Sequence, residues 1–375
     1  MRQRYESGPL VHIAASAHLP APRVVPRYHP AGARHAPEAA RIRSTDGGLR
    51  LARGPPRAPF ERLELPLGQD SEGPVVATLV RRHRSPADLL RHAHGPLHGV
   101  DVLYVHGWSD YFFQVELADR IERLGARFHA LDLRKYGRSL RPHQTPGNVN
   151  DLATYDEDIG AALDAIAAEH HGDSRRRLVP MGHSTGGLTL SLWAARHPER
   201  VDGLILNSPW LEFQASAVGR ALVAPVIKLG ARRNPLAPMP AVDPGFYTRT
   251  VSAAGEGSWT YDQQWRPDRG FPLHPGWLAA VFDGQATVEA GLELEVPVLV
   301  MLSDKSMLQP RWDDGMARAD VALNVDVVAH RALSLGSEVT VRRLHGAVHD
   351  VVLSTPDVRE HAYESIDRWA RSLPR

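Results

Sequence analysis

The chain has no cysteine in its 375 residues and only three lysines. The lack of cysteine excludes a disulfide-stabilised scaffold and a thiol nucleophile. No apolar run approaches the roughly 20 residues that a membrane-spanning helix needs, and the early apolar segment Leu10–Ala17 is too short for a secretory signal. We therefore expect a cytoplasmic protein, with contact to a membrane surface or to lipid left open.

Acidic and basic side chains nearly balance, so the formal net charge is +1 at pH 7. The arginines form no basic stripe with interleaved aromatics, which argues against nucleic-acid binding. A hydrophobic content of 43% over this length supports one large core, with or without an inserted subdomain. Residues 1–57 are rich in Pro, Ala, Arg and His without any sustained period, which predicts a flexible N-terminal extension.

After the extension, strand and helix patterns alternate along the chain. The expected strands are Phe60–Leu67, Val75–Arg82, Val100–Val105, Arg127–Leu131, Arg177–Met181, Val201–Leu206, Pro297–Leu302 and Glu338–Leu344, and the expected helices are Gln114–Leu124, Tyr155–His170, Gly187–Arg196, Val325–Leu335 and Asp357–Ser372. Such alternation predicts an α/β fold, a mostly parallel sheet with helices on both faces. Ligands of such sheets bind beyond the carboxyl ends of the strands.

The alternation fails between residues 209 and 295, where proline, glycine and aromatic residues dominate. We interpret this segment as a cap inserted into a core made of residues 58–208 and 296–375. Three histidines, His92, His94 and His98, lie in an expected loop before the third strand. Without an acidic or cysteine partner they indicate a solvated loop, and no metal site is predicted.

The sequence Gly-His-Ser-Thr-Gly at residues 182–186 follows a buried apolar run and precedes a helical pattern. A sharp turn from strand to helix exposes one serine, and it crowds the backbone so closely that Gly182 and Gly186 must lack side chains. Ser184 is therefore the predicted nucleophile. The backbone N–H groups of Thr185, at the helix start, and of Trp108, after the Val100–Val105 strand, are the predicted oxyanion hole.

A serine nucleophile needs a basic histidine, and that histidine needs a carboxylate. Among the 20 histidines, His349 has the best setting, on a loop of small residues after the last strand. His345 is the lesser candidate, and His183 is expected to support the turn. Two carboxylates compete for the third role: Asp304 directly follows the strand Pro297–Leu302, whereas Asp320 lies shortly before the next helix.

Taken together, these motifs resemble the α/β-hydrolase superfamily, and the chain is similar to its branch of serine aminopeptidases, monoglyceride lipases and lysophospholipases. The matching pieces are His106-Gly107-Trp108, Asp132–Ser139, Gly182–Gly186 and Gly346–His349. The family's acid usually stands in Gly-x-x-Asp-x-x-Val, and Leu302–Lys305 lacks that glycine. The residues after Asp320 fit better, which implies an insertion of about fifteen residues and favours Asp320 over Asp304.

We therefore expect a serine hydrolase, and the cap aromatics, if they line an apolar acyl pocket, favour carboxylic esters as substrates, either lipid-like ones such as monoacylglycerols and lysophospholipids or small acyl esters. No metal or organic cofactor is implied, since side chains carry out all of this chemistry. Trp210, Trp259 and His106 are the predicted substrate-binding residues, although the cap aromatics could equally form a small core of their own. A serine aminopeptidase would need acids to hold the substrate amine, and Glu212, Asp262 and Asp283 could serve. An acyltransferase and a non-catalytic binding protein on the same scaffold are further alternatives.

Overall fold

The computed structural model describes residues 60–82, 95–169, 176–214, 216–239 and 244–374. The expected N-terminal extension and two of the loop histidines, His92 and His94, lie outside the described residues. His98 is described, and its side chain is exposed at the turn before the third strand.

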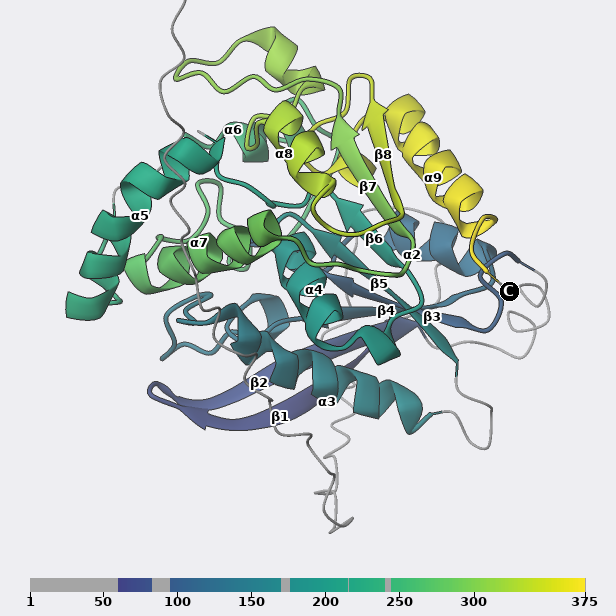
Figure 1. Ribbon diagram of the computed structural model, residues 1–375, viewed down its shortest axis with the longest axis horizontal. Helices are drawn as coiled ribbons and strands as arrows, with labels where there is room; N and C mark the ends of the chain where they lie inside the picture. Colours follow the sequence, from purple (N-terminus) through teal and green to yellow (C-terminus); the bar gives the residue numbers. More distant parts are fainter. Residues whose placement is uncertain (1–59, 83–94, 170–175, 215, 240–243, 375) are drawn as a thin grey trace, which may run out of the picture. The chain divides into compact units, whose positions relative to one another are not determined.

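The described strands form one eight-stranded sheet in the order β1-β2-β4-β3-β5-β6-β7-β8 (Figure 1). Their bounds are β1 Phe60–Asp70, β2 Gly73–Arg82, β3 Val100–Val105, β4 Arg127–Asp132, β5 Arg177–His183, β6 Leu204–Asn207, β7 Val298–Ser303 and β8 Val339–Leu344. β1, β2 and β4 pair antiparallel, and every pairing from β4 through β3 to β8 is parallel. The predicted mostly parallel sheet is confirmed.

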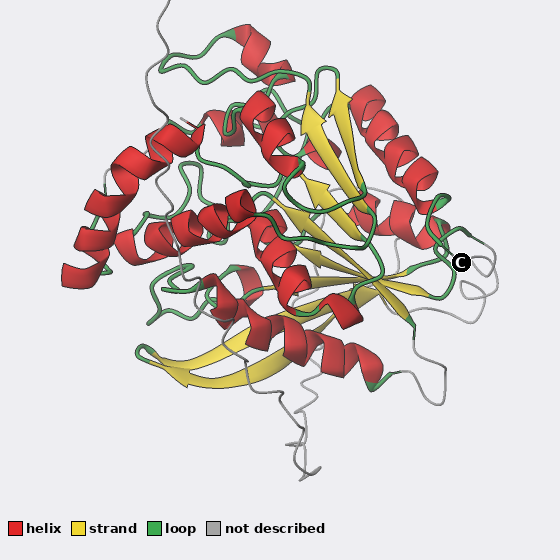
Figure 2. Cartoon of the chain, in the orientation of Figure 1, coloured by secondary structure: helices red, strands yellow, loops and turns green. Residues whose placement is uncertain are grey.

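Helices flank the strands (Figure 2). Using the labels of Figure 1, they are α2 Val115–Arg123, α3 Tyr155–Ala167, α4 Thr185–Arg196, α5 Ser216–Arg233, α6 Phe246–Val251, α7 Pro275–Ala290, α8 Val325–Ala332 and α9 Pro356–Ala370. Side chains of β3 alternate between two hydrophobic cores: Leu103 packs with α3, α4 and α8, whereas Val102 packs with α2 and α9. The sheet is therefore covered on both faces, as the alternating pattern predicts.

The described residues between β6 and β7 form α5, α6 and α7 and add no strand to the sheet. α7 packs against both α5 and α4. This segment corresponds to residues 209–295, which we call the cap; the division into core and cap stays a proposal. None of the described helices is long and apolar enough to cross a bilayer.

Candidate active site

Ser184 stands alone between the last residue of β5 and the first residue of α4. Its backbone has φ +52° and ψ −118°, a conformation that costs energy for a residue with a side chain. A Cβ atom at Gly182 would lie 2.6 Å from the carbonyl oxygen of Gly186, and one at Gly186 would lie 2.3 Å from that of His106. Both glycines are therefore required for the turn, and the strained backbone holds the serine at the carboxyl edge of the sheet.

Three side chains from distant parts of the sequence meet at this edge. The Nε2 atom of His349 lies 3.1 Å from the Oγ atom of Ser184, and its Nδ1 atom lies 2.8 Å from Oδ2 of Asp320. Because a carboxylate only accepts hydrogen bonds, the imidazole proton lies on Nδ1, and Nε2 is free to accept the serine proton. This is the arrangement that activates a serine hydroxyl; the catalytic roles themselves stay a prediction.

Asp320 is held from both sides. Its other oxygen, Oδ1, accepts hydrogen bonds from the backbone N–H groups of Ala322 at 2.7 Å and Leu323 at 2.8 Å. The carboxylate is fully buried. The two backbone hydrogen bonds fix the orientation of the carboxylate, so it can hold the imidazole of His349 in one tautomer.

The segment after β7 explains how Asp320 reaches this place. β7 ends at Ser303. After Lys305 the chain turns away and comes back at Asp320, because the N–H of Asp320 donates to the carbonyl of Lys305 at 3.0 Å and the N–H of Met307 donates to the carbonyl of Asp320 at 2.8 Å. Ser306 and Asp320 form an isolated bridge. The residues between them thus form a closed loop at the position of the predicted insertion.

The two competing candidates, Asp304 and His345, pair with each other instead. Oδ2 of Asp304 lies 2.7 Å from Nδ1 of His345, and the N–H of Gly346 donates to Oδ1 at 3.1 Å. The side chain of His345 is 92% exposed. Among the described contacts, neither residue touches Ser184, so this second Asp–His pair lies outside the site.

The loop after β3 passes directly against the nucleophile, since a Cβ atom at Gly107 would lie 3.0 Å from the Cβ of Ser184. The first N–H groups of a helix have no partner within it, and Thr185 is the first residue of α4. These positions are compatible with an oxyanion bound by the N–H groups of Trp108 and Thr185. Both assignments stay proposals.

Asp132, at the end of β4, holds the loop after β3 in place. Its carboxylate accepts the N–H of Phe112 at 3.0 Å and pairs with the guanidinium of Arg138 at 2.7 Å. That guanidinium also donates to the carbonyl of Phe112 at 3.1 Å. The Asp132–Ser139 motif therefore has a structural task here: it holds the segment that begins with the predicted oxyanion residue.

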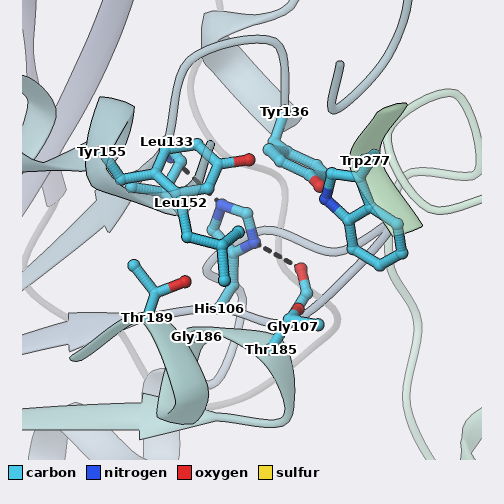
Figure 3. A pocket seen from close by; sticks show the side chains of 10 residues that line it. All are labelled: His106, Gly107, Leu133, Tyr136, Leu152, Tyr155, Thr185, Gly186, Thr189 and Trp277. Carbon is cyan, nitrogen blue, oxygen red and sulfur yellow. Dashed lines mark hydrogen bonds between the residues drawn. The ribbon is translucent and has the colours of Figure 1, made fainter. Parts of the chain in front are cut away.

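A small cavity opens beside the β3 loop and the first turn of α4 (Figure 3). Its lining residues are His106, Gly107, Leu133, Tyr136, Leu152, Tyr155, Thr185, Gly186, Thr189 and Trp277. The indole of Trp277 on α7 lies against that of Trp108, with ring centroids 3.8 Å apart. Aromatic side chains from core and cap thus build a mostly apolar wall next to the predicted oxyanion hole.

His106, a predicted substrate-binding residue, lines this cavity. Its Nε2 accepts the N–H of Leu133 at 3.1 Å, so its proton lies on Nδ1 and donates to the carbonyl of Gly107 at 2.8 Å (Figure 3). Burial lowers the pKa of His106. We therefore expect His106 to be a neutral residue of the cavity lining that takes no part in proton transfer.

The other two predicted substrate-binding residues differ in their surroundings. Trp210 lies beside the cavity wall, with its ring centroid 6.1 Å from that of Trp277. Trp259 donates its indole N–H to the carbonyl of Leu353 at 2.8 Å and packs against Phe113. These contacts of Trp259 fit the alternative of a small core within the cap, so we leave it out of the proposed pocket.

Sequence reasoning did not single out Tyr136, Tyr155 or Trp277 as pocket residues. Trp277 is one of the aromatic residues that mark the cap in the sequence, and Tyr136 is part of the Asp132–Ser139 motif. The sequence does not show which of the many aromatic residues face the cavity.

The eight-stranded sheet and the strained serine turn define the class as an α/β-hydrolase. Within it, this chain belongs to the serine aminopeptidase S33 family, whose sequence profile matches residues 100–314. A relative is the monoacylglycerol lipase of Mycolicibacterium smegmatis, 28% identical over 238 residues, which are 60% of this chain and 78% of that protein.

Solved structures agree on the fold. A soluble variant of monoglyceride lipase from Saccharomyces cerevisiae, in complex with a substrate analogue, superposes with a TM-score of 0.56 at 15% identity, covering 84% of this chain and 97% of that one. A carboxyl esterase from Bacillus coagulans in complex with glycerol gives 0.55 at 16% identity, covering 85% and 99%. The chain is thus an α/β-hydrolase with distant homologues among monoacylglycerol lipases.

Proposed function

We propose that this protein is a serine hydrolase of carboxylic esters. The observation that carries the proposal is the hydrogen-bonded chain from Ser184 through His349 to the buried Asp320. Ser184 attacks the ester carbonyl carbon while its proton moves to Nε2 of His349. The N–H groups of Trp108 and Thr185 stabilise the oxyanion that forms.

The rest of the cycle uses the same groups. The imidazolium of His349 gives its proton to the departing alcohol oxygen, which leaves an acyl group on Ser184. A water molecule then attacks this acyl-enzyme, His349 accepts the water proton, and the acid is released as Ser184 regains its hydrogen. Asp320 stabilises the imidazolium in both halves and keeps its own charge throughout.

The acidic groups of the cap support an ester substrate over a peptide. A serine aminopeptidase needs a free carboxylate to hold the substrate amine, but Glu212 is buried and paired with Arg220 at 2.9 Å and with Arg331 at 2.7 Å. Asp283 is paired with Lys228. The third candidate, Asp262, is exposed, and its Oδ1 accepts the N–H of Gln264 at 2.8 Å; this residue leaves the peptidase alternative open for the test below. The aromatic wall around Trp277 instead suits an apolar acyl group.

Reaction with a fluorophosphonate probe tests the nucleophile. We expect the native protein to be labelled and the Ser184→Ala variant to remain unlabelled, because only an activated serine attacks this phosphorus centre. The native protein is also expected to hydrolyse p-nitrophenyl esters and to leave aminoacyl p-nitroanilides intact. Equal labelling of both proteins would rule out Ser184, and faster turnover of the anilides would favour the peptidase.

We also propose that the outer face of α5 binds to a lipid surface. Val218, Leu222 and Val226 follow one another at helical spacing and are each at least 70% exposed. The last turn of α5 carries two exposed basic residues, Arg232 and Arg233, and residues 213–242 contain no acidic residue. An apolar helix face with basic neighbours fits an anionic lipid surface, and α5 lies at the periphery of the cap (Figure 1).

Sedimentation with vesicles tests this surface. We expect the native protein to bind phosphatidylglycerol vesicles. Leu222→Glu should weaken that binding at least about fivefold, because burying a charged carboxylate in the lipid costs free energy and the anionic surface repels it. Leu333→Glu is the matched control, because Leu333 is also exposed, at 64%, but lies at the end of α8. Hydrolysis of p-nitrophenyl acetate should be unchanged in both variants. Equal binding by the two variants would exclude α5 as the docking face.

A further inference from the structure

A cap residue, Tyr247 on α6, lies against the predicted catalytic base. Its ring centroid is 5.0 Å from that of His349, with the planes at 84°. Its hydroxyl oxygen lies 3.1 Å from Nε2 of His183. The rings of His183 and His349 are themselves 5.0 Å apart. The base is therefore bordered by a second histidine and by a tyrosine that is bound to that histidine.

The hydrogen bonds of His183 define its tautomer. Nδ1 lies 3.1 Å from the carbonyl oxygen of Asn207, which can only accept, so Nδ1 carries the proton. Nε2 must then accept, and the hydroxyl of Tyr247 is its donor. Burial lowers the pKa of His183 to about 4. His183 is thus neutral and has both nitrogen atoms occupied.

Tyr247 is itself held by a buried cation. The guanidinium of Arg266 lies 4.7 Å from the centroid of the Tyr247 ring and 4.4 Å from that of Tyr261. Its Nε atom lies 3.2 Å from Oδ1 of Asp110, and both side chains are almost fully buried. Ligand atoms of Asp110, His183 and Asp350 lie within 4.8 Å of one another, and burial raises the pKa of Asp110 to about 7. The titratable and charged groups that face His183 are therefore Asp110, Asp350, His349 and Arg266.

We propose that Tyr247 and Arg266 are positioning residues by which the cap keeps His349 in its working state. The inference rests on the proposed hydrolase function, in which His349 becomes positively charged. A second imidazolium 5.0 Å away would oppose that charge. The Tyr247 hydroxyl occupies the only nitrogen of His183 that could take up a proton, while the Tyr247 ring limits rotation of His349 away from Ser184. Arg266 holds Tyr247 in place for both tasks.

The test compares two variants that each remove one hydroxyl. Tyr247→Phe keeps the ring but removes the donor to His183. Tyr261→Phe is the matched control, because Tyr261 also lies under Arg266 and packs against Phe113. We expect Tyr247→Phe to lower kcat about tenfold with KM within about twofold, and Tyr261→Phe to match the native protein.

The pH profile of kcat/KM distinguishes this role from a merely structural one. The hydroxyl of Tyr247 occupies Nε2 of His183, so its removal in Tyr247→Phe leaves that nitrogen able to take up a proton. A positive charge there opposes the imidazolium that forms on His349, so the acid limb of the profile is expected to lie at higher pH than in Tyr261→Phe. A profile that superposes on that of Tyr261→Phe would overturn the proposal.

The role of Arg266 is tested in the double variant Asp110→Asn/Arg266→Met, which removes both members of the Arg266–Asp110 pair together and leaves Asp350 hydrogen-bonded to Gln114 and Asn207. We expect it to lose kcat as Tyr247→Phe does, and adding Tyr247→Phe to cause no further loss, because both changes act through the hydroxyl of Tyr247. Independent, multiplying losses would exclude that path. If the native protein takes up no fluorophosphonate, the hydrolase proposal itself fails; a reactive native protein with unaltered Tyr247→Phe overturns only the positioning role.

Discussion

Replacement of His349 by glutamine is expected to lower kcat for p-nitrophenyl acetate by about 10⁶-fold. Glutamine keeps a polar side chain of similar length, but its amide cannot take the proton of Ser184. Nε2 of His349 is the basic nitrogen at hydrogen-bond distance from that hydroxyl, at 3.1 Å. Such a loss corresponds to about 8 kcal/mol of transition-state stabilisation. Steady-state kinetics on folded protein, checked by circular dichroism, measures it.

His345→Gln is the matched control for this change. His345 lies four positions before His349 and also pairs with an aspartate, but its side chain is largely exposed. We expect its kcat to stay within about twofold of the native value. Fluorophosphonate labelling should follow the same order, with His349→Gln nearly unreactive. A large loss in His345→Gln together with an active His349→Gln would move the role of the base to His345.

The serine turn could be predicted from the sequence because its determinants are local. Gly182 and Gly186 flank Ser184 within five residues, and the apolar patterns on both sides specify a strand and a helix. The sheet followed from alternation of the same kind. Strand and helix ends differ from the predictions by a few residues; for example, β6 begins at Leu204 and not at Val201.

The acid was harder to predict because its position depends on a loop that returns on itself. Nothing in the residues alone shows that the chain after Lys305 comes back to the same point at Asp320. The resemblance to the family's motif favoured Asp320, and the geometry agrees with that preference. The contact between His183 and Tyr247 spans 64 residues without any pattern that marks it. Long-range pairs of this kind need coordinates.

Asp320→Asn is expected to lower kcat by about 10⁴-fold. The asparagine amide can turn its NH₂ group toward Nδ1 of His349, which then has to accept and carries its proton on Nε2 instead. A protonated Nε2 cannot take the proton of Ser184. The two backbone N–H groups that bind Oδ1 of Asp320 favour this wrong orientation, because they keep the remaining carbonyl oxygen of the amide on their side. The loss should therefore fall on kcat, with little change in KM.

Asp304→Asn separates this electrostatic effect from a general effect of removing a charge near the site. Both aspartates follow β7, pair with a histidine and accept backbone N–H bonds, so the two substitutions are chemically alike. They differ in burial, and the partner of Asp304 is in contact with solvent, where water replaces a lost hydrogen bond at little cost. We expect Asp304→Asn to keep at least about half of the native kcat. If instead Asp304→Asn lost activity and Asp320→Asn kept it, the His349 imidazole would have to be oriented by a different conformation of the 305–320 loop, with Asp304 at the base.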